Sequence, residues 1–347
     1  MTEYRWVRFF AEHLRRCALA PGEAVAVLSE SDSRRVLVDT ARFAAELCGG
    51  QVVDIVVPTP VNTQAVALRS TGASQALQGN RAAVAALAAA DLVLDCTVEG
   101  LLHAPELSEV LAGGTARILM LSNEHPENYE RYTWDDDLPR RVELARARVA
   151  GADRMRVTSA AGTALEVRLA GAFVAGSTGV TSGPGSIAHW PGGLVAVFPA
   201  AHTVDGTIVL APGDLNLTFK RYVETPVRLV VADDHVVEVE GDGVDAVLFR
   251  SYLSAFDAAA RATSHLGFGL NPTARWDYVE LYDKRDVNGT EARAVAGNFL
   301  YSTGANEHAG RFTAGHFDLP LLGHTIELDG RVVVDAGVLA PELAPAP

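Results

Sequence analysis

Residues 24–57 read AVAVLSESDSRRVLVDTARFAAELCGGQVVDIVV, and our expectation for the fold starts from this stretch. Its first six and last six residues are short apolar runs containing several valines, which is typical of buried strands. Between them, alanine and leucine predict a helix from about Ser33 to Leu47, which Gly49-Gly50 ends. A strand, a helix and a second strand in succession favour a parallel sheet covered by helices on both faces.

The same alternation continues on both sides of this stretch. We predict these further elements: a helix over 6–19 before it, and after it a helix over 81–90 and strands over 91–96 and 117–122. We therefore expect an N-terminal Rossmann-like parallel-sheet domain over residues 1–150. The likeness is in architecture alone, because Ser29-Glu30-Ser31 stands where a dinucleotide-binding domain has its GxGxxG glycines.

Beyond a polar helix predicted over 136–150, the pattern changes to short strands with alternating side chains. We predict strands within 157–169, 207–210, 227–231 and 236–240, a helix over 243–262, and a hairpin over 325–334 that turns at Asp329-Gly330. The expected fold class is therefore α/β plus α+β. Residues 151–347 form a mixed, mostly antiparallel, β-rich metal-binding domain in this prediction.

The composition excludes several classes of protein. With 48% hydrophobic and 21% charged residues, the 347-residue chain can bury a large core, which excludes wholesale disorder. Its 29 basic and 43 acidic residues give a net charge of −14, so nucleic acid and anionic membranes are poor main partners.

Targeting and redox signals are also weak. The first residues lack the apolar run of a signal peptide, and the longest apolar stretch, Ala82–Ala90, is too short to span a bilayer. Three distant cysteines, Cys17, Cys48 and Cys96, form neither a CxxC pair nor a disulfide framework. We expect a soluble, cytoplasmic protein, and the apolar second half favours a homo-oligomer.

The sequence His316-Phe-Asp318 has the spacing of two metal ligands. On a strand, residues two apart point to the same side, so the imidazole and the carboxylate can share one ion. With one more histidine, the set becomes two histidines and one carboxylate, which is typical of non-haem Fe(II) oxygenases and leaves three positions for substrate and O2. The HxD spacing alone is a weak signal.

His265 lies in Thr263-Ser-His-Leu-Gly-Phe-Gly-Leu-Asn-Pro272, where glycines and proline predict a turn. From spacing alone it is either a ligand or a buried histidine bonded to the backbone. Four other histidines lie in charged or polar surroundings, and we expect them to be solvated: His13, His125, His235 and His308.

Five motifs together resemble the 2,5-dihydroxypyridine 5,6-dioxygenases of nicotinate catabolism, over about residues 20–341. They are Leu101-Leu-His-Ala-Pro-Glu106, His189-Trp-Pro-Gly-Gly193, the segment 263–272, Gly297-Asn-Phe-Leu-Tyr-Ser-Thr-Gly-Ala-Asn306 and Gly315-His-Phe-Asp-Leu-Pro320. That family shares its fold with the M29-type metalloaminopeptidases. The resemblance implies an extradiol-like dioxygenase that opens the pyridine ring to N-formylmaleamate with both atoms of O2, holding Fe(II) on His265, His316 and Asp318 without an organic cofactor.

The resemblance also points to a base and to residues that orient the substrate. His103 suits the base, because it follows the third predicted strand and a neutral imidazole accepts a proton near pH 7. The alternative is a histidine that merely precedes a helix. His189 and Arg293 would orient the ring, although Arg293 is also placed to pair with Glu291 or Asp286.

Ser302 is a weaker substrate-binding candidate, with a backbone-bonded turn serine as the alternative. Ser177 marks a departure from the family, whose members carry a substrate-contacting glutamate near this position. Ser177 lies in the glycine-rich stretch 171–185, which we expect to be a flexible loop. The departure affects the preferred ring more than the ring-cleaving chemistry, so the true substrate and its pathway stay open.

Two other functions compete with the dioxygenase. A metal-dependent aminopeptidase of the related fold would hold two metals on additional carboxylates, but Ser264-His265-Leu266-Gly267 and Phe198–His202 lack the paired acids. A non-catalytic binding module would require His265, His316 and Asp318 to be purely structural.

Overall fold

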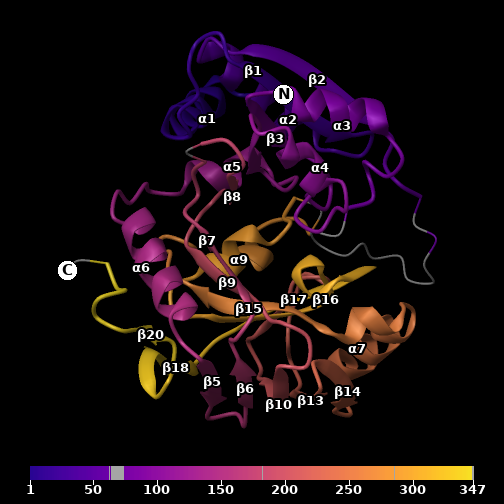
Figure 1. Ribbon diagram of the computed structural model, residues 1–347, viewed down its shortest axis with the longest axis vertical. Helices are drawn as coiled ribbons and strands as arrows, with labels where there is room; N and C mark the ends of the chain where they lie inside the picture. Colours follow the sequence, from indigo (N-terminus) through magenta and orange to yellow (C-terminus); the bar gives the residue numbers. More distant parts are fainter. Residues whose placement is uncertain (62, 64–73, 182, 285, 346–347) are drawn as a thin grey trace.

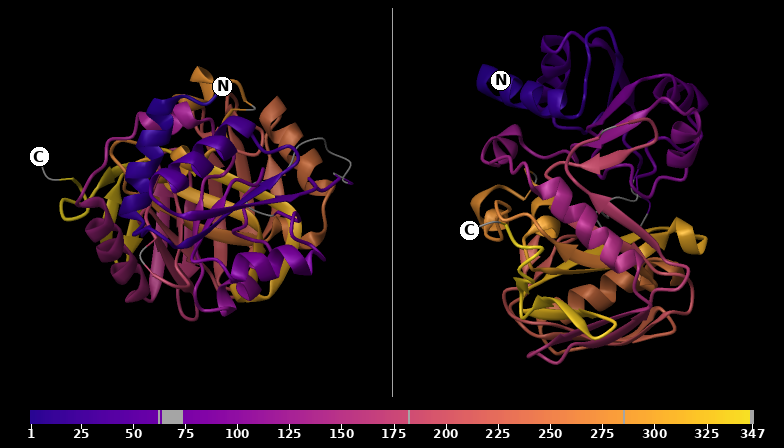
Figure 2. Two further views of the ribbon diagram at one scale, coloured as in Figure 1. Left: turned by 90° about the horizontal axis from the view of Figure 1, so that it is seen from above. Right: turned by 60° about the vertical axis from the view of Figure 1, so that its left-hand side comes forward.

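The computed structural model describes residues 1–61, 63, 74–181, 183–284 and 286–345. A parallel sheet with its helices lies at one end of the molecule, and antiparallel sheets lie at the other (Figure 1). The right-hand view of Figure 2 shows the same two layers one above the other, with chain segments passing between them. The predicted fold class, α/β followed by a mixed, mostly antiparallel β-rich part, is confirmed.

The first sheet has the order β2-β1-β3-β4-β8, and all its pairs are parallel. Its strands are β1 (Ala24–Glu30), β2 (Gln51–Val57), β3 (Leu92–Asp95), β4 (Arg117–Met120) and β8 (Ile187–His189). The helices of this end are α1 (Tyr4–Arg16), α2 (Arg35–Leu47), α3 (Arg81–Ala88), α4 (Leu107–Ala112) and α5 (Pro126–Glu130). Buried residues of α1 and α2 form one core with the sheet, and those of α3 and α4 form another, so both faces are covered as predicted.

The fifth strand of this sheet comes from far along the chain. Ile187 pairs with Ile118, so β8 extends the parallel sheet after the chain has already entered the antiparallel part. The division at residue 150 stays a prediction, and residues 187–189 lie with the first sheet whatever boundary is chosen.

Two antiparallel sheets share the largest core. The eight-stranded sheet runs β14-β13-β10-β6-β5-β18-β19-β20 and the five-stranded sheet runs β17-β16-β15-β9-β7. The strands of the larger sheet are β5 (Arg154–Ser159), β6 (Ala164–Arg168), β10 (Val204–Leu210), β13 (Val227–Ala232), β14 (His235–Glu240), β18 (His324–Leu328), β19 (Arg331–Asp335) and β20 (Val338–Leu339). Those of the smaller sheet are β7 (Phe173–Ser177), β9 (Leu194–Phe198), β15 (Thr263–Gly269), β16 (Phe299–Asn306) and β17 (Arg311–Leu321). Apolar side chains from both sheets meet between them.

Several shorter elements surround these sheets. They are α6 (Leu138–Ala150), the pair β11 (Leu215–Asn216) and β12 (Arg221–Tyr222), α7 (Val244–Ser254), α8 (Tyr278–Leu281), α9 (Thr290–Ala294), and the 3-10 helices η1 (Ala258–Arg261) and η2 (Glu307–Ala309). The helix predicted over 243–262 is therefore split, because α7 ends at Ser254 and a separate turn, capped by Asp257, follows it. Within the described ranges, no helix has the length and apolar character needed to cross a bilayer.

The turn predicted over 263–272 is wrong, since most of this segment is β15. Its glycines serve close packing within the sheet: a Cβ on Gly267 would lie 1.9 Å from the Val195 carbonyl oxygen, and one on Gly269 would lie 2.2 Å from that of Val295. A glycine in a strand marks a place where another backbone approaches closely, and a sequence pattern does not distinguish this from a turn.

Candidate metal centre

Three buried histidines meet between the two ends of the molecule. His103 comes from the segment after β3, His265 from β15 and His316 from β17, and their ligand nitrogens all lie within 4.8 Å of one another. His103 thus comes from the carboxyl edge of the parallel sheet, where α/β folds gather functional groups. His265 and His316 come from one face of the five-stranded antiparallel sheet.

The register of the five-stranded sheet explains why these residues share a face. In β17, His316 and Asp318 face the centre while Phe317 and Leu319 enter the apolar core, as the period of two requires. Ser302 of β16 lies directly opposite Asp318. The predicted same-side placement of the HxD pair is therefore what the strand produces.

His265 reaches the centre through an irregularity in its strand. The pairing of β15 with β16 shifts register between Thr263 and Leu266, and His265 lies within that bulge. Bulges re-aim side chains next to functional sites. The Ser264 hydroxyl contacts Nδ1 of His265 at 3.1 Å, which leaves Nε2 turned toward Asp318 at 3.5 Å.

Asp318 contacts both imidazoles and is paired with the guanidinium of Arg293. Its Oδ1 lies 3.2 Å from Nε2 of His316 and accepts a hydrogen bond from the Ser302 hydroxyl. Its Oδ2 accepts from Nε and Nη2 of Arg293, both at 2.6 Å. Burial opposes ionisation of this carboxyl, but Arg293 and the neighbouring histidines hold its pKa well below the usual range, so Asp318 is a carboxylate.

The donor set fits a metal ion. Burial is the main cause that lowers the pKa of His316, and it lowers the pKa of His265 by more. Both rings are therefore neutral and offer lone pairs at pH 7. Nδ1 of His316 and Nε2 of His103 are buried and have no hydrogen-bond partner among the residues that the structure describes. Two neutral imidazoles and a carboxylate, with a third imidazole beside them, are ligands that suit a divalent transition metal.

His103 is held from both sides. Asp95, at the end of β3, accepts hydrogen bonds from the backbone N–H groups of Thr97 at 3.0 Å and Leu101 at 2.9 Å, which shapes the segment leading to His103. On the other side, Nδ1 of His103 lies 2.9 Å from Oε1 of Glu307. The ring of His103 faces that of His316, with centroids 4.6 Å apart.

Short helix α9 positions Arg293, and the first layer of the molecule anchors this helix. Oε1 of the buried Glu124 accepts hydrogen bonds from the N–H groups of Gly289 and Thr290, where α9 begins. Glu291, also on α9, forms an ion pair with Arg131 at 3.0 Å. Glu291, the alternative partner considered for Arg293, is thus paired with Arg131. The guanidinium of Arg293 is paired with Asp318 instead.

Comparison with known proteins identifies the family of this site. The sequence profile of the 2,5-dihydroxypyridine 5,6-dioxygenases matches residues 5–341. The chain belongs to this family. It is 35% identical over 341 residues to a 2,5-dihydroxypyridine 5,6-dioxygenase of Pseudomonas putida KT2440, with 96% of each chain covered.

Solved structures agree with this assignment. The structure of 2,5-dihydroxypyridine dioxygenase from P. putida KT2440 superposes with a TM-score of 0.90 at 34% identity, covering 98% of both chains. AmpT from Thermus thermophilus, of the M29 aminopeptidases, superposes with a TM-score of 0.61 at 16% identity, covering 97% of this chain and 99% of its own. The second likeness shows the fold alone. The predicted resemblance to the dioxygenase family, and the fold shared with M29 aminopeptidases, are confirmed.

Of the remaining residues predicted from the family, Ser302 contacts the centre, whereas Ser177 contacts the backbone of His189. Ser302 is within the cluster, with its hydroxyl 3.1 Å from Nε2 of His265. His189 ends β8; burial and the charge of Arg293 lower the pKa of His189 to about 4. The Ser177 hydroxyl accepts from the backbone N–H of His189 at 3.1 Å, so it supports the strand that carries His189. The predicted loop over 171–185 begins as a strand, β7.

Sequence reasoning missed Glu307, Asp95 and Glu124. Glu307 directly follows the motif 297–306, and Asp95 ends a predicted strand, so each had a local signal. Glu124 had none, because the N–H groups of α9 that it holds are 165 and 166 residues away. The expectation that His13 is solvated is wrong: its ring is buried and stacks on Trp190 at 3.8 Å.

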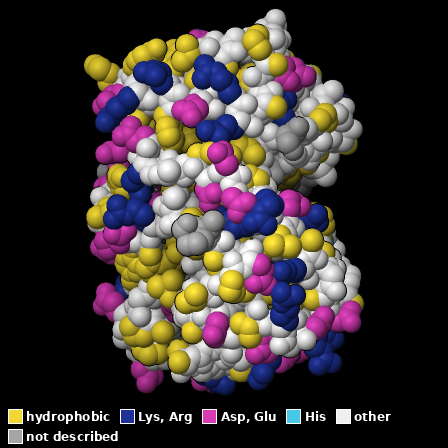
Figure 3. Space-filling view, turned by 90° about the vertical axis from the view of Figure 1, so that its left-hand side faces the viewer, with side chains coloured by type: hydrophobic (Ala, Val, Ile, Leu, Met, Phe, Trp, Pro, Cys, Tyr) yellow, Lys and Arg dark blue, Asp and Glu magenta, His cyan; other side chains and the backbone are white. Residues whose placement is uncertain are grey.

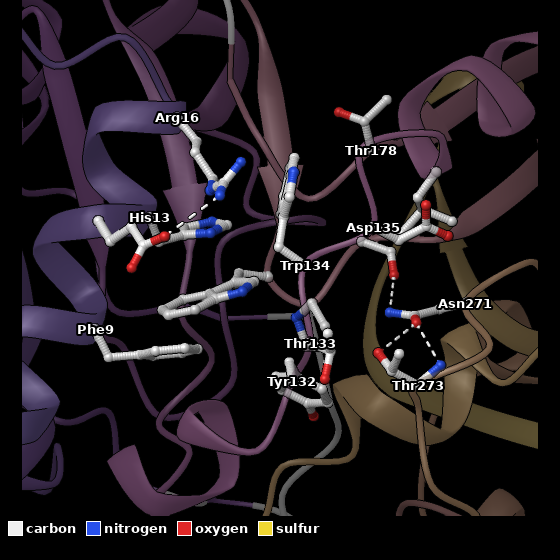
Figure 4. A pocket seen from close by; sticks show the side chains of 15 residues that line it. Phe9, His13, Arg16, Tyr132, Thr133, Trp134, Asp135, Thr178, Asn271 and Thr273 are labelled. Atoms are coloured by element: carbon white, nitrogen blue, oxygen red, sulfur yellow. Dashed lines mark hydrogen bonds and ion pairs between the residues drawn. The ribbon is translucent and has the colours of Figure 1, made fainter.

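A separate cavity of about 130 Å³ lies beside the segment that follows His189 (Figure 4). None of the three clustered histidines lines it. Its walls include the aromatic side chains of Phe9, Tyr132, Trp134 and Trp190. His13 and Trp190 both line this cavity, and their stacking holds Trp190, the residue directly after His189.

Proposed function

We propose that the protein is an Fe(II)-dependent, extradiol-like dioxygenase that opens the ring of a hydroxylated pyridine, 2,5-dihydroxypyridine or a close analogue, with both atoms of O2. The product is an N-formylmaleamate-type open chain. The contacts of buried His265 and His316 with Oδ1 of Asp318, at 3.5 and 3.2 Å, carry this proposal. Family membership supports the same chemistry.

His265, His316 and Asp318 would hold the iron. When bound, Fe(II) supplies a centre at which an electron-rich ring and O2 can react. The residues around it exclude water, since all three ligands are 3% exposed or less. Arg293 keeps Asp318 ionised and fixes the direction of its Oδ1, so the carboxylate is oriented before any ion arrives.

His103 would act as the base. Its Nε2 is buried and faces the histidine cluster, where it can accept the proton of a ring hydroxyl. His189, Arg293, Ser302 and Ser177 would surround the substrate; of these, His189 is kept neutral and is able to donate or accept one hydrogen bond to a ring substituent.

The site favours this reaction over peptide hydrolysis. A pair of hydrolytic metal ions needs several carboxylates, and the group assembled in the described part of the chain has three histidines, two of which contact one carboxylate, Asp318. Among the described residues, the other carboxylate that contacts one of these histidines is Glu307, which is bonded to Nδ1 of His103 and not to His265 or His316.

We further propose a small heteroaromatic substrate and O2 as the reactants, in a cytoplasmic homo-oligomer. On the face shown in Figure 3, Lys and Arg side chains are interspersed with Asp and Glu, and the chain carries a net charge of −14. The cysteines in the described ranges are free and buried, which suits a reducing compartment.

The test combines metal analysis with turnover. Protein purified without oxygen should contain one iron per chain, bind 2,5-dihydroxypyridine or a related ring, and consume one O2 per ring opened. With ¹⁸O2, both labelled atoms should appear in the product. Two zinc-like ions with release of amino acids from peptides would overturn the proposal in favour of the aminopeptidase, and absence of metal would favour a binding module.

A further inference from the structure

The hydrogen bond between His103 and Glu307 crosses from one layer of the molecule to the other. Nδ1 of His103 and Oε1 of Glu307 are 2.9 Å apart. The His103 side chain is 0% exposed, whereas that of Glu307 is 26% exposed. The opposite nitrogen of the ring, Nε2, is buried and unpaired among the described residues.

Glu307 is held rigidly on the sheet that carries the proposed metal ligands. It begins η2, directly after β16. The Asn306 side chain donates to the Pro199 carbonyl at 2.9 Å and accepts from the N–H of Ala309 at 3.1 Å, which fixes this turn. The ring of His308 stacks on Phe173 with centroids 4.0 Å apart.

The chemistry of this pair selects one form of the imidazole. An ionised carboxylate only accepts hydrogen bonds, so Nδ1 of His103 must carry the hydrogen. In a neutral ring the lone pair is then on Nε2, the atom that faces the cluster. Burial alone would raise the pKa of Glu307, but the hydrogen bond from His103, the charges of His103 and His308 and a backbone hydrogen bond together hold the pKa below its usual value.

We propose that Glu307 is a positioning residue, which fixes the tautomer and the orientation of His103 so that the Nε2 lone pair points at the substrate. The effect on turnover rests on the proposed function; the effect on the tautomer does not.

Three variants separate positioning from folding. Glu307→Gln is nearly isosteric, but its amide can either donate to Nδ1 or accept from it, so it no longer selects a tautomer. Glu307→Ala removes the bond and leaves a partly exposed gap that acetate can enter. Glu238→Gln, on the exposed face of β14, is the matched control for loss of one negative charge.

The first measurement is independent of catalysis. In full-length protein labelled with [¹⁵N]histidine, before iron loading, His103 is assigned by its loss in a His103→Gln spectrum. We expect the Nδ1–H form in the parent and in Glu238→Gln, and a mixture of tautomers in Glu307→Gln. An unchanged tautomer in both Glu307 variants overturns the proposal.

The second measurement is steady-state turnover with the iron-loaded enzyme. We expect Glu307→Gln and Glu307→Ala to lower kcat about tenfold or more, with KM and iron content nearly unchanged. Acetate, but not chloride at equal ionic strength, should restore part of kcat in Glu307→Ala. If kcat and the melting temperature both fall in the two Glu307 variants, and acetate does not restore kcat in Glu307→Ala, Glu307 has a structural role. A parent enzyme without turnover would overturn the proposed function and leave the tautomer result to decide.

Discussion

At the scale of single residues, the metal ligands are the first point to test. We expect His316→Ala and Asp318→Asn each to lower the iron content at least tenfold, because the first removes one of three proposed ligands and the second removes the negative charge from the buried site. Elemental analysis of anaerobically purified protein measures this, and circular dichroism checks the fold. His202→Ala is the control, since His202 is an exposed histidine bonded to Asp233. Full iron occupancy in either variant removes that residue from the ligand set.

His103 gives a different prediction, because it lies beside the predicted ligands. We expect His103→Ala to retain iron and to lose about 100-fold or more in kcat, as a base affects the rate rather than metal affinity. Rates within a few-fold of the parent at neutral pH would return His103 to the role of a histidine before a helix. Loss of iron would instead add His103 to the ligands.

How much of the site can be predicted from sequence depends on where each residue's partners lie. The HxD spacing of His316 and Asp318 was informative because its geometry needs only one strand. His265 could not be assigned by spacing, since its orientation depends on a bulge against β16. Glu307 directly follows the motif 297–306, which marks its neighbourhood, but its contact with a residue 204 positions away follows only from the fold.

At the scale of elements, α9 contacts both layers. Glu124 and Arg131 of the first layer hold α9, and Arg293 on α9 is paired with Asp318 of the second. Glu124→Gln should lower the free energy of unfolding by about 1–3 kcal/mol, because one carboxylate oxygen becomes an NH2 group that must face a donor, either the N–H groups of α9 or the side-chain amide of Asn128. We also expect weaker substrate binding, since α9 carries Arg293. Urea unfolding and KM measure the two effects, with Glu127→Gln on the exposed side of α5 as the control. An unchanged KM would show that Arg293 keeps its place without this anchor.

The elements themselves were predicted with uneven success, for a physical reason. Buried parallel strands such as β1 and β3 are short apolar runs, and their sequence signal is local. The segment of β15 was taken for a turn because glycine has two uses, positive φ and close approach of a neighbouring strand. The close approach of Val195 in β9 to Gly267, and of Ala294 and Val295 to Gly269, distinguishes them.

At the scale of the whole molecule, buried neutral histidines govern acid stability. His324 is bonded to Thr163 and to the Leu322 carbonyl, and burial lowers its pKa to about 4. The unfolded chain, with a histidine pKa near 6.5, takes up the proton first, so stability is lost as pH falls from about 6.5 to 4. Protonation linked to this residue alone lowers the free energy of unfolding by about 2 kcal/mol at pH 5.

The measurement is urea unfolding between pH 7 and pH 5. We expect the pH dependence to be shallower in His324→Gln than in the parent by about that amount. His235→Gln, a change at a less buried histidine, should leave it as in the parent. Equal pH dependence in the parent and His324→Gln would mean that His324 titrates alike in both states.

The return of the chain to the parallel sheet at β8 has a consequence for synthesis in the cell. The edge of β4 stays open until residues 187–189 have left the ribosome, and by then β5, β6 and β7 have already been made. The N-terminal layer therefore cannot be completed co-translationally as a unit before the second layer starts to form. Nascent chains halted near residue 150 should expose this edge to chaperones, whereas chains halted well beyond residue 189 should not.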